Sequence, residues 1–214
     1  MSIDRSGTPF IGIAALIALA LIFMGQKLAA FPFLILALFF LYFFRDPDRQ
    51  SAAGPDEVIS PADGRVLVAG DAEPAGAPPG TWRQISIFLS PVDVHVNRIP
   101  LSGRISRVSY TPGKFLPAYR TEAASQNERN EIWIEHGSQT IIVRQVVGVL
   151  ARRIVCRLGE GAEVTAGQRY GIMKFGSRMD LYLPPDTALT VRIGDRVRSG
   201  ETTLARLAGA RDDR

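Results

Sequence analysis

The sequence has few of the residues that carry disulfide chemistry, and it has no basic cluster. Its 214 residues include one cysteine, Cys156, and only two histidines, His95 and His136. A single cysteine cannot form an internal disulfide, so Cys156 is expected to be a small buried hydrophobic residue in a cytosolic setting. The formal net charge is +4, but the arginines are scattered and no run of five basic residues occurs. The sequence therefore argues against a nucleic-acid partner, and no metal site is predicted.

Charge is nearly absent from the first 44 residues, where Asp4, Arg5 and Lys27 are the three charged side chains. The runs Phe10–Met24 and Leu28–Phe44 contain none. As helices they would be about 22 and 25 Å long, slightly shorter than the ~30 Å hydrocarbon core of a bilayer. We predict a hydrophobic helical membrane anchor of one or two helices. It either crosses a thin bilayer as a hairpin or enters one leaflet and returns.

Basic residues flank this anchor. Arg5 precedes it, and Arg45 and Arg49 follow it, so both ends of a hairpin face one compartment, which the positive-inside rule makes the cytoplasm. A cleaved signal peptide is the alternative, because Ala29 and Ala30 are small, but a second apolar run follows at once. The prediction is a protein of the cell membrane, peripheral or N-terminally anchored, with its remaining residues on the cytoplasmic side.

Residues 45–57 are a polar linker containing proline and glycine, and residues 58–214 have the pattern of a β-rich domain. Short runs rich in β-branched and aromatic residues alternate with turn signals. The predicted strands are Arg65–Ala69, Gln84–Leu89, Gly103–Tyr110, Glu131–His136, Thr140–Val147, Met179–Leu183 and Ala188–Ile193. One short helix is expected around Thr121–Arg129. The fold class is mainly β.

One internal repeat refines this fold. Gly161–Gly167 and Gly194–Gly200 share the frame G-x-x-V-x-x-G. Glycines permit tight turns, and the central Val164 and Val197 are expected to fill the core. The frame resembles the hairpins of lipoyl- and biotinyl-type domains, so we predict a β-sandwich or barrel-like domain with lipoyl-like hairpins.

The segment Phe88–Pro100, FLSPVDVHVNRIP, combines strand-like residues with polar ones. Strand alternation would place Asp93, His95 and Asn97 on one face, where they need partners if they are buried. His95 is therefore a candidate catalytic residue. His136 precedes a glycine at the end of a predicted hairpin and is expected to be an exposed turn residue.

Two further stretches contain turn-forming pairs. Ser60–Gly64 reads SPADG, and its Asp63 follows a proline at a typical turn. Gly171–Pro184 reads GIMKFGSRMDLYLP and contains the pair Gly176-Ser177. A serine hydroxyl held against the preceding carbonyl can attack it, with a nearby imidazole as base. The resulting ester can split by β-elimination, and the dehydroalanine that remains becomes a pyruvoyl group on loss of ammonia.

Together, and in this order, these stretches resemble the phosphatidylserine decarboxylase family in its short form with an N-terminal hydrophobic segment. The matching motifs are PADG at Pro61–Gly64, FLSPVDVHVNRIP at Phe88–Pro100, NER at Asn127–Arg129 and FGS at Phe175–Ser177. The resemblance implies a proenzyme cleaved at 176/177 into a β chain, 1–176, and an α chain, 177–214, which remain associated. It implies phosphatidylserine as substrate, phosphatidylethanolamine as product, and a covalent pyruvoyl cofactor made from Ser177.

The resemblance also implies residue roles. Asp63 and His95 assist cleavage, and Asp93 supports His95. Longer family members carry a second histidine where this chain has Arg98, which is better suited to hold a lipid phosphate or carboxylate. The segment around Lys114 is expected to reach the headgroup region of a membrane.

Two other functions stay open at this point. A biotin or lipoate carrier is suggested by Met173-Lys174, but Lys174 lies seven residues past Gly167 rather than about ten, and the usual preceding acidic residue is missing. The second is a membrane-anchored adaptor without catalysis, which would leave Asp63, His95 and Ser177 without a purpose. The lipid backbone and the oligomeric state, a homo-oligomer included, also stay open.

Overall fold

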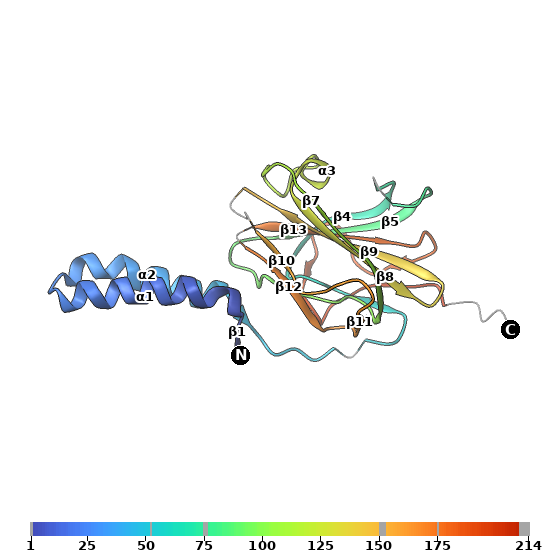
Figure 1. The fold of residues 1–214 in the computed structure, drawn as a ribbon. Coiled ribbons are helices and arrows are strands. Elements are labelled where there is room, and N and C mark those ends of the chain that lie inside the picture. Colours follow the sequence, from blue (N-terminus) through green and yellow to red (C-terminus); the bar gives the residue numbers. More distant parts are fainter. Residues whose placement is uncertain (1, 52, 75–76, 150–152, 175, 210–214) are drawn as a thin grey trace. The chain divides into compact units, whose positions relative to one another are not determined.

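The computed structural model describes the chain except residues 1, 52, 75–76, 150–152, 175 and 210–214. It forms two compact units, Met1–Asp48 and Arg49–Arg214, which are described separately (Figure 1). Unit 1 contains the predicted anchor, and unit 2 contains the β-rich part of the chain.

Unit 1 is a helical hairpin. Its elements are β1 (Ser2–Ile3), the 3-10 helix η1 (Arg5–Gly7), α1 (Thr8–Phe23), α2 (Lys27–Phe43) and β2 (Arg45–Asp46). Buried alanines allow the two helices to pack closely, and these are Ala14, Ala18, Ala30 and Ala37. At the open end, β1 pairs antiparallel with β2, and the Phe10 and Phe44 rings stack with centroids 5.5 Å apart. The two ends of the hairpin therefore emerge side by side, as predicted.

The outer surface of this hairpin is apolar, with Leu16, Phe23 and Leu28 among its exposed side chains. Within the described residues, one helical stretch, Arg5–Phe23, is long and apolar enough to cross a membrane, and Lys27–Phe43 is shorter. By length and composition alone this is weak evidence for an anchor. The helices themselves begin and end within two residues of the predicted runs.

Unit 2 is mainly β. Its strands are β3 (Glu57–Ile59), β4 (Gly64–Ala72), β5 (Trp82–Leu89), β6 (Val96–Arg98), β7 (Gly103–Thr111), β8 (Arg129–His136), β9 (Gln139–Val147), β10 (Ile154–Cys156), β11 (Glu163–Val164), β12 (Arg169–Met173), β13 (Ser177–Leu183), β14 (Ala188–Leu189), β15 (Arg196–Val197) and β16 (Thr203–Arg206). One short helix, α3 (Ala123–Gln126), precedes β8. The predicted strands are all present, although the run 188–193 contributes only β14.

The strands form one curled half-barrel sheet of eight and two sheets of three (Figure 1). The large sheet has the order β11-β7-β8-β9-β13-β5-β4-β15, and the small ones are β10-β12-β6 and β14-β16-β3. All these pairings are antiparallel. One continuous apolar core lies between the sheets.

The two copies of the internal repeat supply the two edge strands of the large sheet, β11 and β15. Val164 in β11 pairs with Gly103 at one edge, and Val197 in β15 pairs with Gly64 at the other. Both valines are buried in the core, and the flanking glycines of each repeat have positive φ angles of 78 to 96°. The predicted role of the repeat, tight turns around a core valine, is confirmed.

Strand β13 is central, and all seven of its residues are buried. It lies between β5 and β9. Alternation sends Met179, Leu181 and Leu183 into the core. Arg178 and Asp180 face the other way and form a buried ion pair. The loop around α3 covers that face, where the Arg120 carbonyl accepts a hydrogen bond from Arg178.

Candidate active site

Ser177 is the first residue of β13 and pairs with Leu89 on one side and Val147 on the other. It has the same alternation as Met179 and Leu181, so its side chain points to the core face of the sheet. Ser177 is fully buried, and its hydroxyl has no hydrogen-bond partner among the described residues. Buried hydroxyls are usually hydrogen-bonded, and Ser177 shares this missing partner with Thr187 and Ser199 among the described residues.

The backbone before Ser177 is shaped for a close approach. Gly176 has φ +70°, a conformation that side chains disfavour. Gly148, just past β9, lies so close that a Cβ atom there would come within 2.4 Å of the Gly176 carbonyl oxygen. Phe175, part of the FGS motif, lies outside the described residues. The Gly176-Ser177 peptide is thus packed between β5 and the end of β9.

His95 reaches this peptide from the loop between β5 and β6. Its ring is fully buried, and Nδ1 lies 2.9 Å from the backbone carbonyl oxygen of Asp93. A carbonyl only accepts, so this contact assigns the proton to Nδ1. Nε2 then accepts from the Gly176 N–H, at 3.4 Å. The unprotonated nitrogen of His95 therefore lies one residue from the Gly176-Ser177 bond.

The prediction that Asp93, His95 and Asn97 lie on one face of a strand is wrong for Asp93. Strand β6 begins only at Val96, so alternation does not extend to Asp93. The Asp93 carboxylate instead accepts from the backbone N–H of Ser90 at 2.8 Å and from its hydroxyl at 2.7 Å, which closes a turn. Asp93 supports His95 through its main chain.

Asp63 lies in the turn between β3 and β4. Its carboxylate accepts two hydrogen bonds from the Arg49 guanidinium and one from the Ser199 N–H at 2.8 Å. These three bonds hold Asp63 to Arg49 and to the backbone of Ser199. Arg49, in the predicted linker, is a partner of Asp63 that the sequence did not indicate.

The two predicted substrate contacts differ in exposure. Arg98 is 5% exposed, and its Nη1 donates to the Gly167 carbonyl at 3.0 Å. Lys114 is exposed and donates to the Gln126 side chain at 3.0 Å. Arg98, the last residue of β6, is thus part of the packed interior, whereas Lys114 lies on the surface.

Asn127, from the NER motif, ties a loop to the site. Its Nδ2 donates to the carbonyls of Leu116 and Val147, each at 2.8 Å, and its Oδ1 accepts from the Leu116 N–H. These bonds hold the loop of residues 113–119 against the end of β9, next to Gly148. Only the family resemblance drew attention to Asn127.

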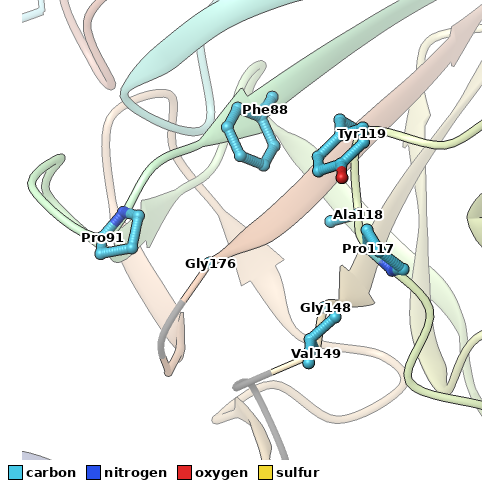
Figure 2. A pocket seen from close by; sticks show the side chains of 8 residues that line it. All are labelled: Phe88, Pro91, Pro117, Ala118, Tyr119, Gly148, Val149 and Gly176. Carbon is cyan, nitrogen blue, oxygen red and sulfur yellow. The ribbon is translucent and has the colours of Figure 1, made fainter.

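A pocket of about 140 Å³ opens beside Gly176. Figure 2 shows its lining, which is almost wholly apolar: Phe88, Pro91, Pro117, Ala118, Tyr119, Gly148, Val149 and Gly176. The Phe88 and Tyr119 rings meet edge to face, with centroids 6.1 Å apart. No cluster of three or more histidine, cysteine or acidic residues able to hold a metal ion occurs in the described part of the chain.

Gly176, with its positive φ, thus has the His95 imidazole at its N–H and, on its other side, the buried Ser177 hydroxyl, which has no hydrogen-bond partner among the described residues. The sequence model of phosphatidylserine decarboxylase matches residues 36–205. The chain belongs to the phosphatidylserine decarboxylase family, a family of decarboxylases.

Curated relatives extend the match over nearly the whole chain. A phosphatidylserine decarboxylase proenzyme of Desulfotalea psychrophila is 43% identical over 206 residues, 96% of each chain. Proteins of the same name from Magnetococcus marinus and Solibacter usitatus are 42% and 45% identical, over 97% and 90% of this chain and 96% and 89% of their own. The family membership argues against the carrier and adaptor alternatives.

Proposed function

We propose that the chain cleaves itself between Gly176 and Ser177, gains a pyruvoyl group at Ser177, and decarboxylates phosphatidylserine to phosphatidylethanolamine. The observation that supports this most is the buried Ser177 hydroxyl, which has no partner among the described residues, next to the peptide that His95 Nε2 contacts. The relatives' name, proenzyme, agrees with processing.

In the proposed cleavage, His95 Nε2 takes the Ser177 hydroxyl proton, and Oγ attacks the Gly176 carbonyl carbon. The C–N bond breaks and an ester forms, with the proton transferred to the Ser177 nitrogen. Removal of the Ser177 α-proton then expels the Gly176 carboxylate, and loss of ammonia by hydrolysis leaves the pyruvoyl carbonyl. The fixed Nδ1–H to Asp93 contact keeps the base in one tautomer throughout.

The residues around Ser177 fit formation of a pyruvoyl group, because the serine oxygen would leave with the Gly176 carboxylate without breaking a hydrogen bond to any described residue, and water would supply the keto oxygen. This group would supply the electron sink for decarboxylation. His95 would hold the proton needed at the reacting carbon, and the apolar pocket beside Gly176 would exclude water from it.

We also propose the cellular arrangement that follows. The hairpin of residues 1–44 would anchor the protein in the cell membrane with the catalytic unit on the cytoplasmic side. The large and small chains would remain a heterodimer, because β13 pairs on both sides with strands of the large chain.

Intact mass spectrometry tests the cleavage. The wild type should yield two chains, residues 1–176 and 177–214, the second without a free N-terminal amine. Ser177→Ala should remain one chain of 23.4 kDa. Ser199→Ala is the matched control, because Ser199 is equally buried and its hydroxyl also lacks a partner in the described structure, and it should be cut normally. A wild type that releases CO₂ from phosphatidylserine while wholly uncut would contradict the proposal.

A further inference from the structure

Exposed apolar side chains line the apolar pocket or lie within two residues of its lining. Val92, Phe115, Tyr119 and Val149 are 59, 40, 61 and 51% exposed. We call these four residues the pocket rim. They come from three loops that are far apart in sequence, and each loop contributes lining residues to the pocket: Pro91, Pro117 to Tyr119, and Gly148 with Val149 (Figure 2).

Two of the three loops that carry the pocket rim are held in place by hydrogen bonds. Asn127 bonds both main-chain groups of Leu116, and the Lys114 main chain bonds to residues 126 and 128. The Asp93 carboxylate closes the turn that presents Val92. Single exposed apolar residues need no explanation, but an apolar group fixed around a pocket indicates a binding surface.

The charge near the pocket rim favours one partner. Lys114 and Arg120 lie on the loop that carries Phe115 and Tyr119, and both cations are exposed. Glu122 is the exposed acidic residue on the same stretch. Apolar side chains flanked by cations suit the interface of a bilayer with anionic lipids, where apolar groups insert and cations meet headgroups.

The size of the pocket agrees with this partner. Its volume of about 140 Å³ is below the ~300–1,000 Å³ of sites that bury most of a drug-sized ligand. It can enclose only a small part of a phospholipid near the reacting group. The acyl chains must then stay in the bilayer, which requires the pocket mouth to lie at the membrane surface.

We propose that the pocket rim inserts into the surface of an anionic bilayer, as a membrane contact of the catalytic unit distinct from residues 1–44. The contact lets a lipid reach Gly176 without leaving the membrane. Its purpose rests on the proposed lipid substrate, but the contact itself does not depend on catalysis.

The test uses the full-length protein in a Cys156→Ala background with a single cysteine at Val92, Val149 or Ser138, labelled with the polarity-sensitive dye NBD. Ser138 is the matched control, because it is exposed and lies in the turn before β9, whose other end carries the pocket rim. At ~3.3 Å per residue, the nine residues of β9 separate the two ends by about 30 Å. The vesicles contain phosphatidylcholine and phosphatidylglycerol.

After reconstitution into vesicles, the fluorescence emission of NBD at Val92 and Val149 should shift to shorter wavelength and gain intensity. The reference is the same labelled protein in detergent at its lowest working concentration. Vesicles with brominated acyl chains should quench this emission. NBD at Ser138 should do neither. The same spectrum at all three positions, unquenched by the brominated lipid, would overturn the inference.

Activity separates this result from the proposed function. If the rim dyes stay in water while wild-type protein releases CO₂ from phosphatidylserine in the same vesicles, the membrane contact is wrong and the decarboxylase remains. If the rim dyes are buried and no CO₂ is released, the contact stands and the proposed function fails. Phe115→Asp should lower turnover on vesicles severalfold more than turnover on a short-chain micellar substrate, and equal losses on both would also contradict the contact.

Discussion

Gly148 offers a direct test of the geometry around the Gly176 carbonyl. A Cβ atom at position 148 would lie 2.4 Å from the Gly176 oxygen and 3.3 Å from its carbon. Ordinary contact begins at 3.4 Å, so Gly148→Ala must move the carbonyl that Ser177 attacks, or its own backbone, by about 1 Å. A misplacement of about 1 Å in a near-attack geometry can slow a reaction ~100-fold. We therefore expect self-cleavage of Gly148→Ala to slow ~100-fold, equivalent to about 2.7 kcal/mol of barrier.

Gly103→Ala is the matched control. Its added Cβ would meet the Glu135 carbonyl oxygen at 2.2 Å, a similar overlap at the edge of the same sheet. Each substitution should destabilise the fold by about 1–3 kcal/mol through overpacking. Neither glycine has a positive φ, so backbone strain does not distinguish them. Gly103→Ala should cleave at the wild-type rate wherever it is folded.

The assay follows the appearance of the small chain by gel and mass spectrometry after synthesis in a cell-free system, with circular dichroism to show that both variants fold. The reasoning is refuted if folded Gly148→Ala is processed as fast as wild type. It is equally refuted if Gly103→Ala slows as much, because the effect would then come from general strain.

Three further predictions follow from other contacts. His95→Ala should accumulate uncut chain while His136→Ala is processed normally, as judged on the same gels, and normal cleavage without His95 would point to another base. Arg178→Met should destabilise the catalytic unit by about 3–5 kcal/mol in urea unfolding, because it leaves Asp180 charged and buried, and the double variant with Asp180→Leu should recover most of this. Full-length protein should stay with membranes in high salt and leave them in detergent, because salt does not screen apolar burial, and release by salt alone would argue against the anchor at residues 1–44.

The strands could be predicted from the sequence because their signal is local. Runs such as Thr140–Val147 alternate or are rich in β-branched residues, and β9 follows the prediction within one residue. The structure of the two G-x-x-V-x-x-G frames could also be predicted from the sequence, since each frame specifies a turn and one core side chain. The run 188–193 became a shorter strand because β14 has only two partner residues in β16.

The contacts within the site could not be read in the same way. Asp93 has strand-like neighbours, but Pro91 and the Ser90 bonds turn the chain before β6 begins. Asp63 and Arg49 are 14 residues apart, and their pairing depends on how the β3–β4 turn packs. Local pattern gives the candidates, and only the tertiary fold shows which of them touch.

The position of the proposed cut explains how one fold could serve both the precursor and the enzyme. The bond lies immediately before β13. This strand lies between β5, with which seven of its residues pair, and β9, with which six pair. The segment after β13 is also held by the large chain, since β15 pairs with β4 and β16 pairs with β3. Cutting the chain at Ser177 therefore leaves the pairings of residues 178–183 in place, and only residue 177 loses its backbone nitrogen. The backbone next to the cut is already turned by Gly176. The new chain end would stay between β5 and β9, with its keto carbon at the former Cα of Ser177 and its methyl carbon at the former Cβ, on the core face of the sheet.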